Sequence, residues 1–270
     1  MRSEFYNLTP DIMRSNKSFP LISVIIPTFN AIEFLLKAIE SALQQTYSNF
    51  EVLVIDDGST DNTRLVIQDN NRIKYYHQEN KGLSSARNLG IEKSRGDYLV
   101  FLDADDSLEK DALQLNYAVI QNKPGIAFVS GNYYLLRAES NELELITTTV
   151  TDDHYIRLLK SNYIGMHAAV MFQRWVFEHV RYDETLKACE DYDLYLGIAR
   201  KYPVLHHQQF IATYYFHSSG ISHDYQLMID SINIVIKKQR PFVRTAEEKS
   251  AYLEGSTQWK HYYGLMKESL

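Results

Sequence analysis

The segment GDYLVFLDADD, residues 96–106, decides the fold. Residues 98–102 are almost wholly apolar, which predicts a short strand buried on both faces of a sheet. Three carboxylates, Asp103, Asp105 and Asp106, follow this strand directly. Because close carboxylates oppose one another's ionisation, they favour a nearby cation, and a metal that bridges phosphates needs only one or two of them. The alternative is a polar turn whose side chains cap the next helix.

Composition indicates a soluble globular protein of one large domain or two small ones. The chain has 270 residues, of which 45% are hydrophobic and 23% charged. A net charge of −6 argues against a nucleic-acid partner. The single Cys189 excludes an internal disulfide and favours a cytoplasmic location, with the inner face of a membrane as an alternative. We expect no signal peptide and no transmembrane segment, because no apolar run approaches the roughly 20 residues of a membrane span.

Strands and helices alternate in the first part of the chain. Apolar runs predict strands at 21–26, 52–55, 73–77 and 98–102, with a helix in each connection. We expect a proline to stop the first strand at 26, and Asn30 to cap the helix that follows in a capping box. This order with short connections predicts a largely parallel sheet with right-handed crossovers and helices on both faces.

The carboxyl ends of the strands in such a sheet meet at one edge, where ligands bind. Residues 27–30, 56–57 and 103–106 occupy three of these ends, and two of the three carry carboxylates. Neither G-x-G-x-x-G nor G-x-x-x-x-G-K-[ST] follows the first strand, which excludes the usual dinucleotide and P-loop sites. A bound phosphate would instead need a metal and basic side chains. Lys81 and Arg87, at a helix N-terminus, are candidates, and the alternative for Arg87 is a surface cation.

Four segments together resemble a known family. They are VIIPTFN at 24–30, DDGSTD at 56–61, NKGLSSARNLG at 80–90 and DAD at 103–105. In order and spacing they are similar to the family 2 glycosyltransferases of GT-A fold, densely over residues 21–106 and more thinly to about 220. The resemblance implies an α/β fold with a Rossmann-like, mostly parallel central sheet flanked by helices, and here a C-terminal helical extension.

The resemblance also implies roles for residues at the matching positions. The nucleotide-sugar donor would be bound by Pro27, Thr28, Asn30, Asp57, Lys81, Arg87, Asp103 and Ala104. Among these, Asp57 would accept a hydrogen bond from uracil, and Asp103 would contact ribose or metal. Asp105 would bind Mn²⁺ or Mg²⁺ across the diphosphate, with His217 near the metal or the diphosphate. Tyr215 stands where the family often has arginine, which puts one phosphate contact in doubt.

A second acidic segment, CEDYDL at 189–194, begins another predicted helix. Glu190 and Asp193 suit the positive end of a helix. Asp191 shares its helical face with the apolar Leu194 and Ile198, so it turns toward the packed side and needs another explanation. In the resembling family, the aspartate of this Glu-Asp pair is the catalytic base. A carboxylate opposite the leaving group can deprotonate an acceptor hydroxyl as it attacks the sugar.

The rest of the chain is expected to hold the acceptor and a helical tail. Predicted elements are helices at 108–121 and 152–159, strands at 126–130, 166–172 and 210–216, and a hairpin from 133–137 to 143–149. The C-terminal helices, broken at Pro241, have three open roles: packing on the core, a homodimer contact, or a peripheral membrane surface. We divide the chain into a leader (1–20), a nucleotide-sugar-binding half (21–115), an acceptor-binding half (116–221) and a helical tail (222–270).

These features predict a metal-dependent, inverting glycosyltransferase. It would move a sugar from a nucleoside-diphosphate donor, most simply a UDP-sugar, to a hydroxyl of a glycan or lipid-linked acceptor. Such a reaction belongs to polysaccharide, lipopolysaccharide or capsule synthesis. The alternatives are a nucleotidyltransferase of related fold and an inactive sugar-nucleotide-binding module.

Overall fold

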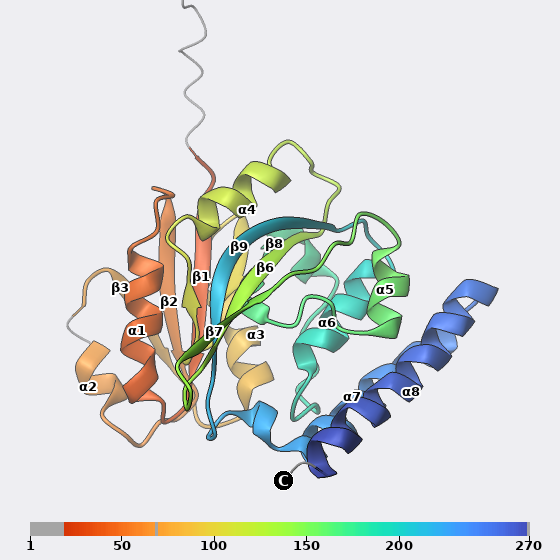
Figure 1. Ribbon diagram of the computed structural model, residues 1–270. Helices are drawn as coiled ribbons and strands as arrows, with labels where there is room; N and C mark the ends of the chain where they lie inside the picture. Colours follow the sequence, from red (N-terminus) through yellow and green to blue (C-terminus); the bar gives the residue numbers. More distant parts are fainter. Residues whose placement is uncertain (1–18, 68–69, 269–270) are drawn as a thin grey trace, which may run out of the picture.

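A mixed sheet forms the centre of the structure, a computed structural model that describes residues 19–67 and 70–268 (Figure 1). The predicted leader lies almost wholly outside the described residues. The strand order is β3-β2-β1-β4-β8-β6-β9-β5, and β7 pairs with β6. The strands are β1 (Ile22–Thr28), β2 (Phe50–Asp56), β3 (Ile73–His77), β4 (Tyr98–Phe101), β5 (Ser107–Leu108), β6 (Phe128–Arg137), β7 (Glu142–Ile146), β8 (Val170–Gln173) and β9 (Leu205–Phe216).

The parallel pairs of the N-terminal half confirm the expected α/β sheet. The strands β1 to β4 pair in parallel, with β1 between β2 and β4. All of β1 is buried, and its Ile25 belongs to one core cluster while Val24 and Ile26 belong to the other. Beyond β4 the sheet becomes mixed, because β8 is antiparallel to both β4 and β6.

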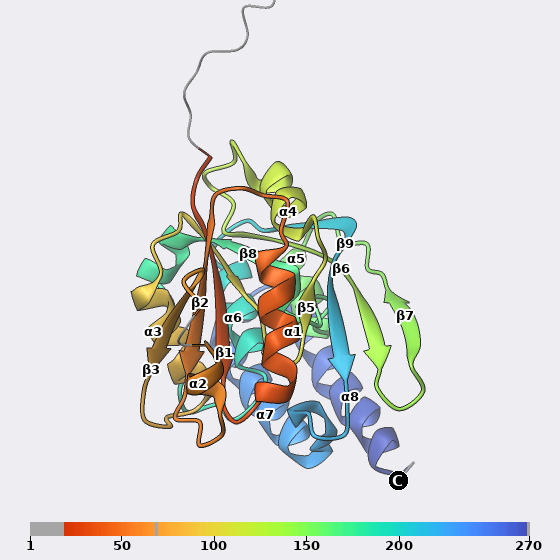
Figure 2. The same cartoon turned by 90° about the vertical axis from the view of Figure 1, so that its left-hand side faces the viewer.

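Helices cover both faces of the sheet (Figure 2). The helices are α1 (Ile32–Leu43), α2 (Thr63–Ile67), α3 (Leu83–Lys93), α4 (Ala112–Ile120), α5 (His154–Lys160), α6 (Glu190–Ala199), α7 (Tyr225–Gln239) and α8 (Ala246–Glu268). Short 3-10 turns occur at His167–Ala169, Arg174–Glu178, Ile221–His223 and Arg240–Phe242. Buried side chains of α1 and α4 share one core cluster, whereas those of α3, α5, α6 and α7 share the cluster on the opposite face.

Two local predictions at the end of β1 were wrong. The strand runs through Pro27 to Thr28, because β4 pairs with β1 only as far as Ile25 and no partner there needs the missing proline N–H. Asn30 does not cap α1. It adopts a φ of 50°, and its Oδ1 accepts the backbone N–H groups of Thr60, at 2.7 Å, and Asp61, at 3.3 Å. The loop after β2 is thereby fastened to the loop after β1.

The second half also departs from the predicted boundaries. Ser107 and Leu108 form β5 against β9 instead of starting a helix, which begins at Ala112. The two short strands predicted at 126–130 and 133–137 are one strand, β6, with a register shift near Asn132. The predicted hairpin is present as β6–β7.

The C-terminal helices α7 and α8 pack on α5 and α6 of the same chain (Figure 1). Ile232, Val235, Ile236 and Ala251 are buried in the core cluster of that face. Lys238 holds α7 to its neighbours, since its Nζ lies 2.6 Å from Asp193 Oδ2 and 2.7 Å from an Asp183 oxygen. The tail is therefore part of the folded domain. Within the described ranges, none of the helices combines the length and the apolar character needed to cross a membrane.

Gly255 should be required for the close contact between α8 and α5. A Cβ added there would lie 2.0 Å from the carbonyl oxygen of Leu159, so Gly255→Ala must push the helices apart. Overpacking of this kind costs roughly 1–3 kcal/mol, which urea unfolding measures.

Gly197→Ala in α6 is the matched control. An added Cβ there meets no atom of the described chain within 4 Å, and alanine is favoured over glycine in a helix by about 1 kcal/mol. Equal unfolding midpoints for the two variants would contradict the close packing of α8.

Candidate active site

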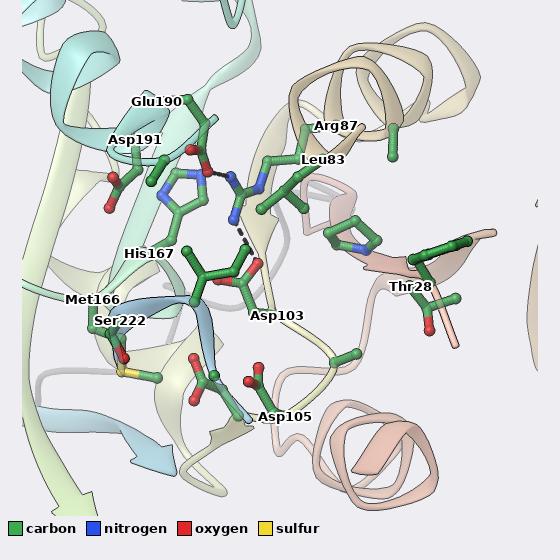
Figure 3. A pocket seen from close by; sticks show the side chains of 18 of the residues that line it. Thr28, Leu83, Arg87, Asp103, Asp105, Met166, His167, Glu190, Asp191 and Ser222 are labelled. Carbon is green, nitrogen blue, oxygen red and sulfur yellow. Dashed lines mark hydrogen bonds and ion pairs between the residues drawn. The ribbon is translucent and has the colours of Figure 1, made fainter. Parts of the chain in front are cut away.

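A cavity of about 700 Å³ opens at the carboxyl ends of β1, β2 and β4 (Figure 3). Its other walls come from the start of α3, the start of α6 and the end of β9. Nine of the predicted site residues line it: Pro27, Thr28, Asp57, Arg87, Asp103, Ala104, Asp105, Asp191 and His217. The strand-end segments of the first half meet here, as the strand-end argument predicted, and Asp191 and His217 of the second half lie in the same space.

The other two predicted residues, Asn30 and Lys81, do not line this cavity. Asn30 is exposed and its amide is used to join two loops. The side chain of Lys81 is also exposed, and its backbone N–H donates to Asp57 Oδ1 at 2.9 Å. Both residues therefore shape loops beside the cavity.

Asp57 organises the turn that precedes α3. Its Oδ1 accepts hydrogen bonds from the amide of Gln78, at 2.6 Å, and from the backbone of Lys81, and its Oδ2 accepts the Gly82 N–H at 2.8 Å. Gly82 has a φ of 94°, a conformation that favours glycine. Asp57 thus positions the N-terminus of α3 at the cavity wall, where its own carboxylate is also part of the lining.

Arg87 is a buried cation shared by two carboxylates (Figure 3). Its Nη2 donates to Asp103 Oδ1 at 2.5 Å, its Nη1 donates to Glu190, and its guanidinium lies 5.5 Å from the ring centre of Tyr182. Burial alone would lower the pKa of Arg87, but Asp103 and Glu190 outweigh burial and hold it well above its usual value. The surface-cation alternative is excluded. Arg87 connects the loop after β4 with the first turn of α6.

Asp105 and His217 lie together on the opposite wall. The Nε2 of His217 is 3.0 Å from Asp105 Oδ2, its Nδ1 is 2.7 Å from the Ser219 hydroxyl, and its ring stacks on Phe34 at 4.6 Å. Burial and the nearby Asp103 raise the pKa of Asp105, so a cation here would stabilise its ionised form.

The side chains of Asp105 and His217 fit a divalent cation that also takes ligands from the substrate. Among the described residues, no group of three or more His, Cys, Asp or Glu side chains is arranged to hold a metal by itself. An oxygen of Asp105 and a nitrogen of His217 could supply two ligands, and diphosphate oxygens could supply others. Asp106 has a different role: it is buried, its Oδ1 accepts the Tyr215 N–H at 3.0 Å, and burial raises its pKa well above the usual value.

Thr28 lines the same cavity and carries a buried hydroxyl. The residue is only 4% exposed, and within the described structure its Oγ1 makes no hydrogen bond. A buried hydroxyl left unpaired costs free energy in the folded protein.

Asp191 lies in the first turn of α6 (Figure 3). Cys189 precedes the helix as its N-cap and has a left-handed φ of 59°. Asp191 Oδ1 accepts the Tyr192 N–H at 2.7 Å. Burial and the negative charge of Glu190 raise the pKa of Asp191 to about 7, although Arg87 acts in the opposite direction. A carboxylate with such a pKa can accept a proton near neutral pH.

Some lining residues were missed or given a different role. Glu190, interpreted as a helix-dipole acid, is the ion-pair partner of Arg87. His167 is another lining residue. It is buried, its Nδ1 lies 2.6 Å from the Tyr195 hydroxyl, and burial lowers its pKa well below the usual value. Met166, Tyr214, Ser222 and Met228 also line the cavity, and no motif identified them because they come from separate elements.

Solved structures show the class of fold. TarS of S. aureus in complex with UDP superposes with a TM-score of 0.64 at 19% identity, over 87% of this chain and 70% of that one. The mannosyltransferase PcManGT of Pyrobaculum calidifontis, in complex with GDP-Man and Mn²⁺, gives 0.65 at 17% identity, over 90% and 70%. The fold is therefore that of the GT-A glycosyltransferases.

The family model described as "Glycosyl transferase family 2" matches residues 23–180, and the chain belongs to this family. An uncharacterized glycosyltransferase of Haemophilus influenzae is 36% identical over 191 residues, 68% of this chain and 74% of that protein. The chondroitin synthase of Escherichia coli is 32% identical over 70% of this chain, which spans only 28% of the synthase. An uncharacterized Rickettsia bellii glycosyltransferase is likewise matched over 28% of its length.

Arg87 should be among the most important residues for stability. Arg87→Met leaves Asp103 and Glu190 without their cation, and breaking a buried pair in this way costs roughly 3–5 kcal/mol of unfolding free energy. Urea unfolding at pH 7.5 measures the loss.

The matched control is Arg95→Met. The side chain of Arg95 is 71% exposed and lies 3.6 Å from Glu51, so its removal should cost about 1 kcal/mol or less. A loss at Arg87 no larger than at Arg95 would contradict the structural role of the buried pair.

Proposed function

We propose that this protein is a metal-dependent, inverting glycosyltransferase that transfers a sugar from a UDP-sugar to a hydroxyl of a glycan or lipid-linked acceptor. The observation that carries the proposal is the position of Asp191, on a cavity wall that also includes Asp103, Asp105 and His217. One cavity thus offers a candidate base and a candidate diphosphate site. The similarity to chondroitin synthase supports a role in polysaccharide assembly.

The donor would bind with its nucleoside against β1 and α3 and its diphosphate toward Asp105. Pro27 and Thr28 would line the nucleoside pocket, and the carboxylate of Asp57 would accept the N–H of uracil. TarS in complex with UDP and with UDP-GlcNAc supports a uridine nucleotide. PcManGT, by contrast, was solved with GDP-Man.

Asp105 and His217 would hold Mn²⁺ or Mg²⁺, in line with the Mn²⁺ in the PcManGT complex. A divalent cation offsets the negative charge that develops on the departing nucleotide. Arg87 would support this wall indirectly, because it orients Asp103 beside Asp105 and neutralises part of the local negative charge.

Asp191 would act as the general base. Its raised pKa means that it is mainly ionised above pH 7 and protonated below, so transfer should weaken as the pH falls through about 7. The acceptor hydroxyl would give its proton to Asp191 and attack the anomeric carbon opposite the leaving nucleotide. One such displacement inverts the configuration, and NMR of the product would show it. A cytoplasmic location and a homodimer stay predictions.

Calorimetric titration with UDP, with and without Mn²⁺, tests the donor site. We expect UDP to bind at least tenfold more tightly with Mn²⁺, because the metal links Asp105 to the diphosphate, and Asp105→Asn to remove this gain. Glu109→Gln, on an acid outside the cavity lining, is the control. Metal-independent binding of UDP would contradict the metal site, and preference for a nucleoside triphosphate would favour the nucleotidyltransferase alternative.

Asp191→Asn should reduce transfer by a factor of about 10² or more while leaving UDP affinity within twofold, because the amide cannot accept the proton. Asp193→Asn is the matched control, since Asp193 faces Lys238 and does not line the cavity. Rates measured between pH 5.5 and 9 should fall on the acid side of about pH 7 for the unmodified protein. An unchanged transfer rate in Asp191→Asn would contradict the role of Asp191 as the general base.

A further inference from the structure

A second cavity, of about 530 Å³, adjoins the first. Its walls come from β6, the loop after α5, the start of α6, the end of β9 and the C-terminal helices α7 and α8. Six residues line both cavities: Gly165, Cys189, Asp191, Tyr214, Ser222 and Met228. The candidate base Asp191 therefore lies at the boundary between the two spaces. A group bound in the second cavity would face the same carboxylate as the donor sugar in the first.

The second cavity has an aromatic lining. Tyr133, Tyr192, Phe216, Tyr225 and Trp259 contribute rings from five different elements. The rings of Tyr192 and Trp259 pack edge to face with centres 5.9 Å apart, which gives this wall a defined shape. Tyrosine and tryptophan combine apolar faces with polar tips, a combination that suits the C–H faces and hydroxyl groups of a pyranose ring.

The charges around this cavity favour an uncharged occupant. The two cations in its wall, Lys160 and Arg137, already face carboxylates: Lys160 Nζ lies 2.8 Å from Glu254, and Arg137 lies 3.4 Å from Glu144. The guanidinium of Arg137 also lies over the ring of Phe216. Asp191 adds negative charge, so the cavity would attract a phosphorylated group only weakly. The binding of a neutral saccharide does not depend on this charge.

The C-terminal helices provide one wall of the second cavity. Tyr225, Met228 and Ile232 come from α7, and Gln258 and Trp259 come from α8. These helices lie beyond the stretch matched by the family model, which ends at residue 180. Packing against α5 and the Lys238 bonds to α6 hold them in place, so they can form a rigid binding surface.

We propose that the second cavity is the acceptor site, that its occupant is a neutral saccharide stacked on the aromatic rings, and that α7 and α8 set its specificity. The assignment rests on the proposed transfer reaction. It adds the chemical class of the acceptor and the helices that would select this acceptor. A hydroxyl of the bound saccharide would reach Asp191 from one side while the donor sugar occupies the other.

Saturation-transfer NMR of the full chain with UDP and Mn²⁺ present tests this site. The probes are methyl and octyl β-glycosides of glucose, galactose, N-acetylglucosamine and N-acetylgalactosamine. UDP occupies the nucleotide part of the first cavity and leaves its donor-sugar part open, so variants of the second cavity decide where a bound glycoside lies. We expect methyl glycosides to bind, and Trp259→Ala to weaken that binding by about tenfold while UDP affinity changes less than twofold.

Gln258→Ala provides an independent variant, because the exposed Gln258 can be shortened without opening the core, and a smaller loss of glycoside affinity is expected. Leu253→Ala is the matched control in α8: its side chain is 64% exposed and outside the cavity lining, so binding should not change.

If Trp259→Ala and Gln258→Ala both bind the glycosides as tightly as the unmodified protein, α8 does not contribute to the acceptor site. Binding of none of the methyl glycosides while UDP binds would overturn the saccharide occupant, and binding of octyl glycosides alone would assign the cavity to a lipid chain. Failure of UDP itself to bind would instead count against the proposed glycosyltransferase reaction and, with it, against an acceptor site.

Discussion

The buried guanidinium of Arg87 is the interaction on which the rest of the site depends. It joins Asp103, in the loop after β4, to Glu190, in the first turn of α6. Burial of a charge costs free energy unless an opposite charge pairs with it. Asp103 and Glu190 stabilise the buried guanidinium, and the guanidinium stabilises both carboxylates. The pair therefore fixes the distance between the loop that carries Asp105 and the helix that carries Asp191. One set of ion pairs therefore positions both Asp105 and Asp191.

The same arrangement separates the acids by function. Asp103 and Glu190 share the single charge of Arg87, whereas Asp106 accepts the Tyr215 N–H of β9 and burial raises its pKa. Among the residues that the structure describes, the ion-pair partner of Asp105 is the imidazole of His217, which leaves the carboxylate available to a cation. Asp191 has no cationic partner as close as that of Glu190, and burial next to Glu190 raises its pKa into the range of a base. One cavity thus contains acids in distinct protonation environments.

The C-terminal helices extend this site beyond the part of the chain that defines the family. They are held by the closely packed Gly255 and by Lys238, and they add aromatic side chains on the far side of Asp191. Two adjoining cavities with a shared carboxylate match the needs of a two-substrate reaction. The family-matched stretch supplies the strand-end wall of the first cavity, whereas Asp191, His217 and Met228 of its lining lie beyond that stretch. The tail contributes most to the second cavity, where we propose that acceptor preference is set.

The sequence by itself determined the α/β class, the strands β1 to β4, the position of the strand-end acids and the candidate base, because apolar periodicity and the motifs are local signals. It also identified Arg87, but as a donor contact or a surface cation. Only the tertiary structure decided that Arg87 is buried between Asp103 and Glu190, that Asn30 joins two loops, that β5 replaces the first turn of a helix, and that the tail lines a second cavity. These features depend on contacts between residues far apart in the chain, such as Arg87 with Glu190, and no local pattern specifies which distant charge or ring will be the partner.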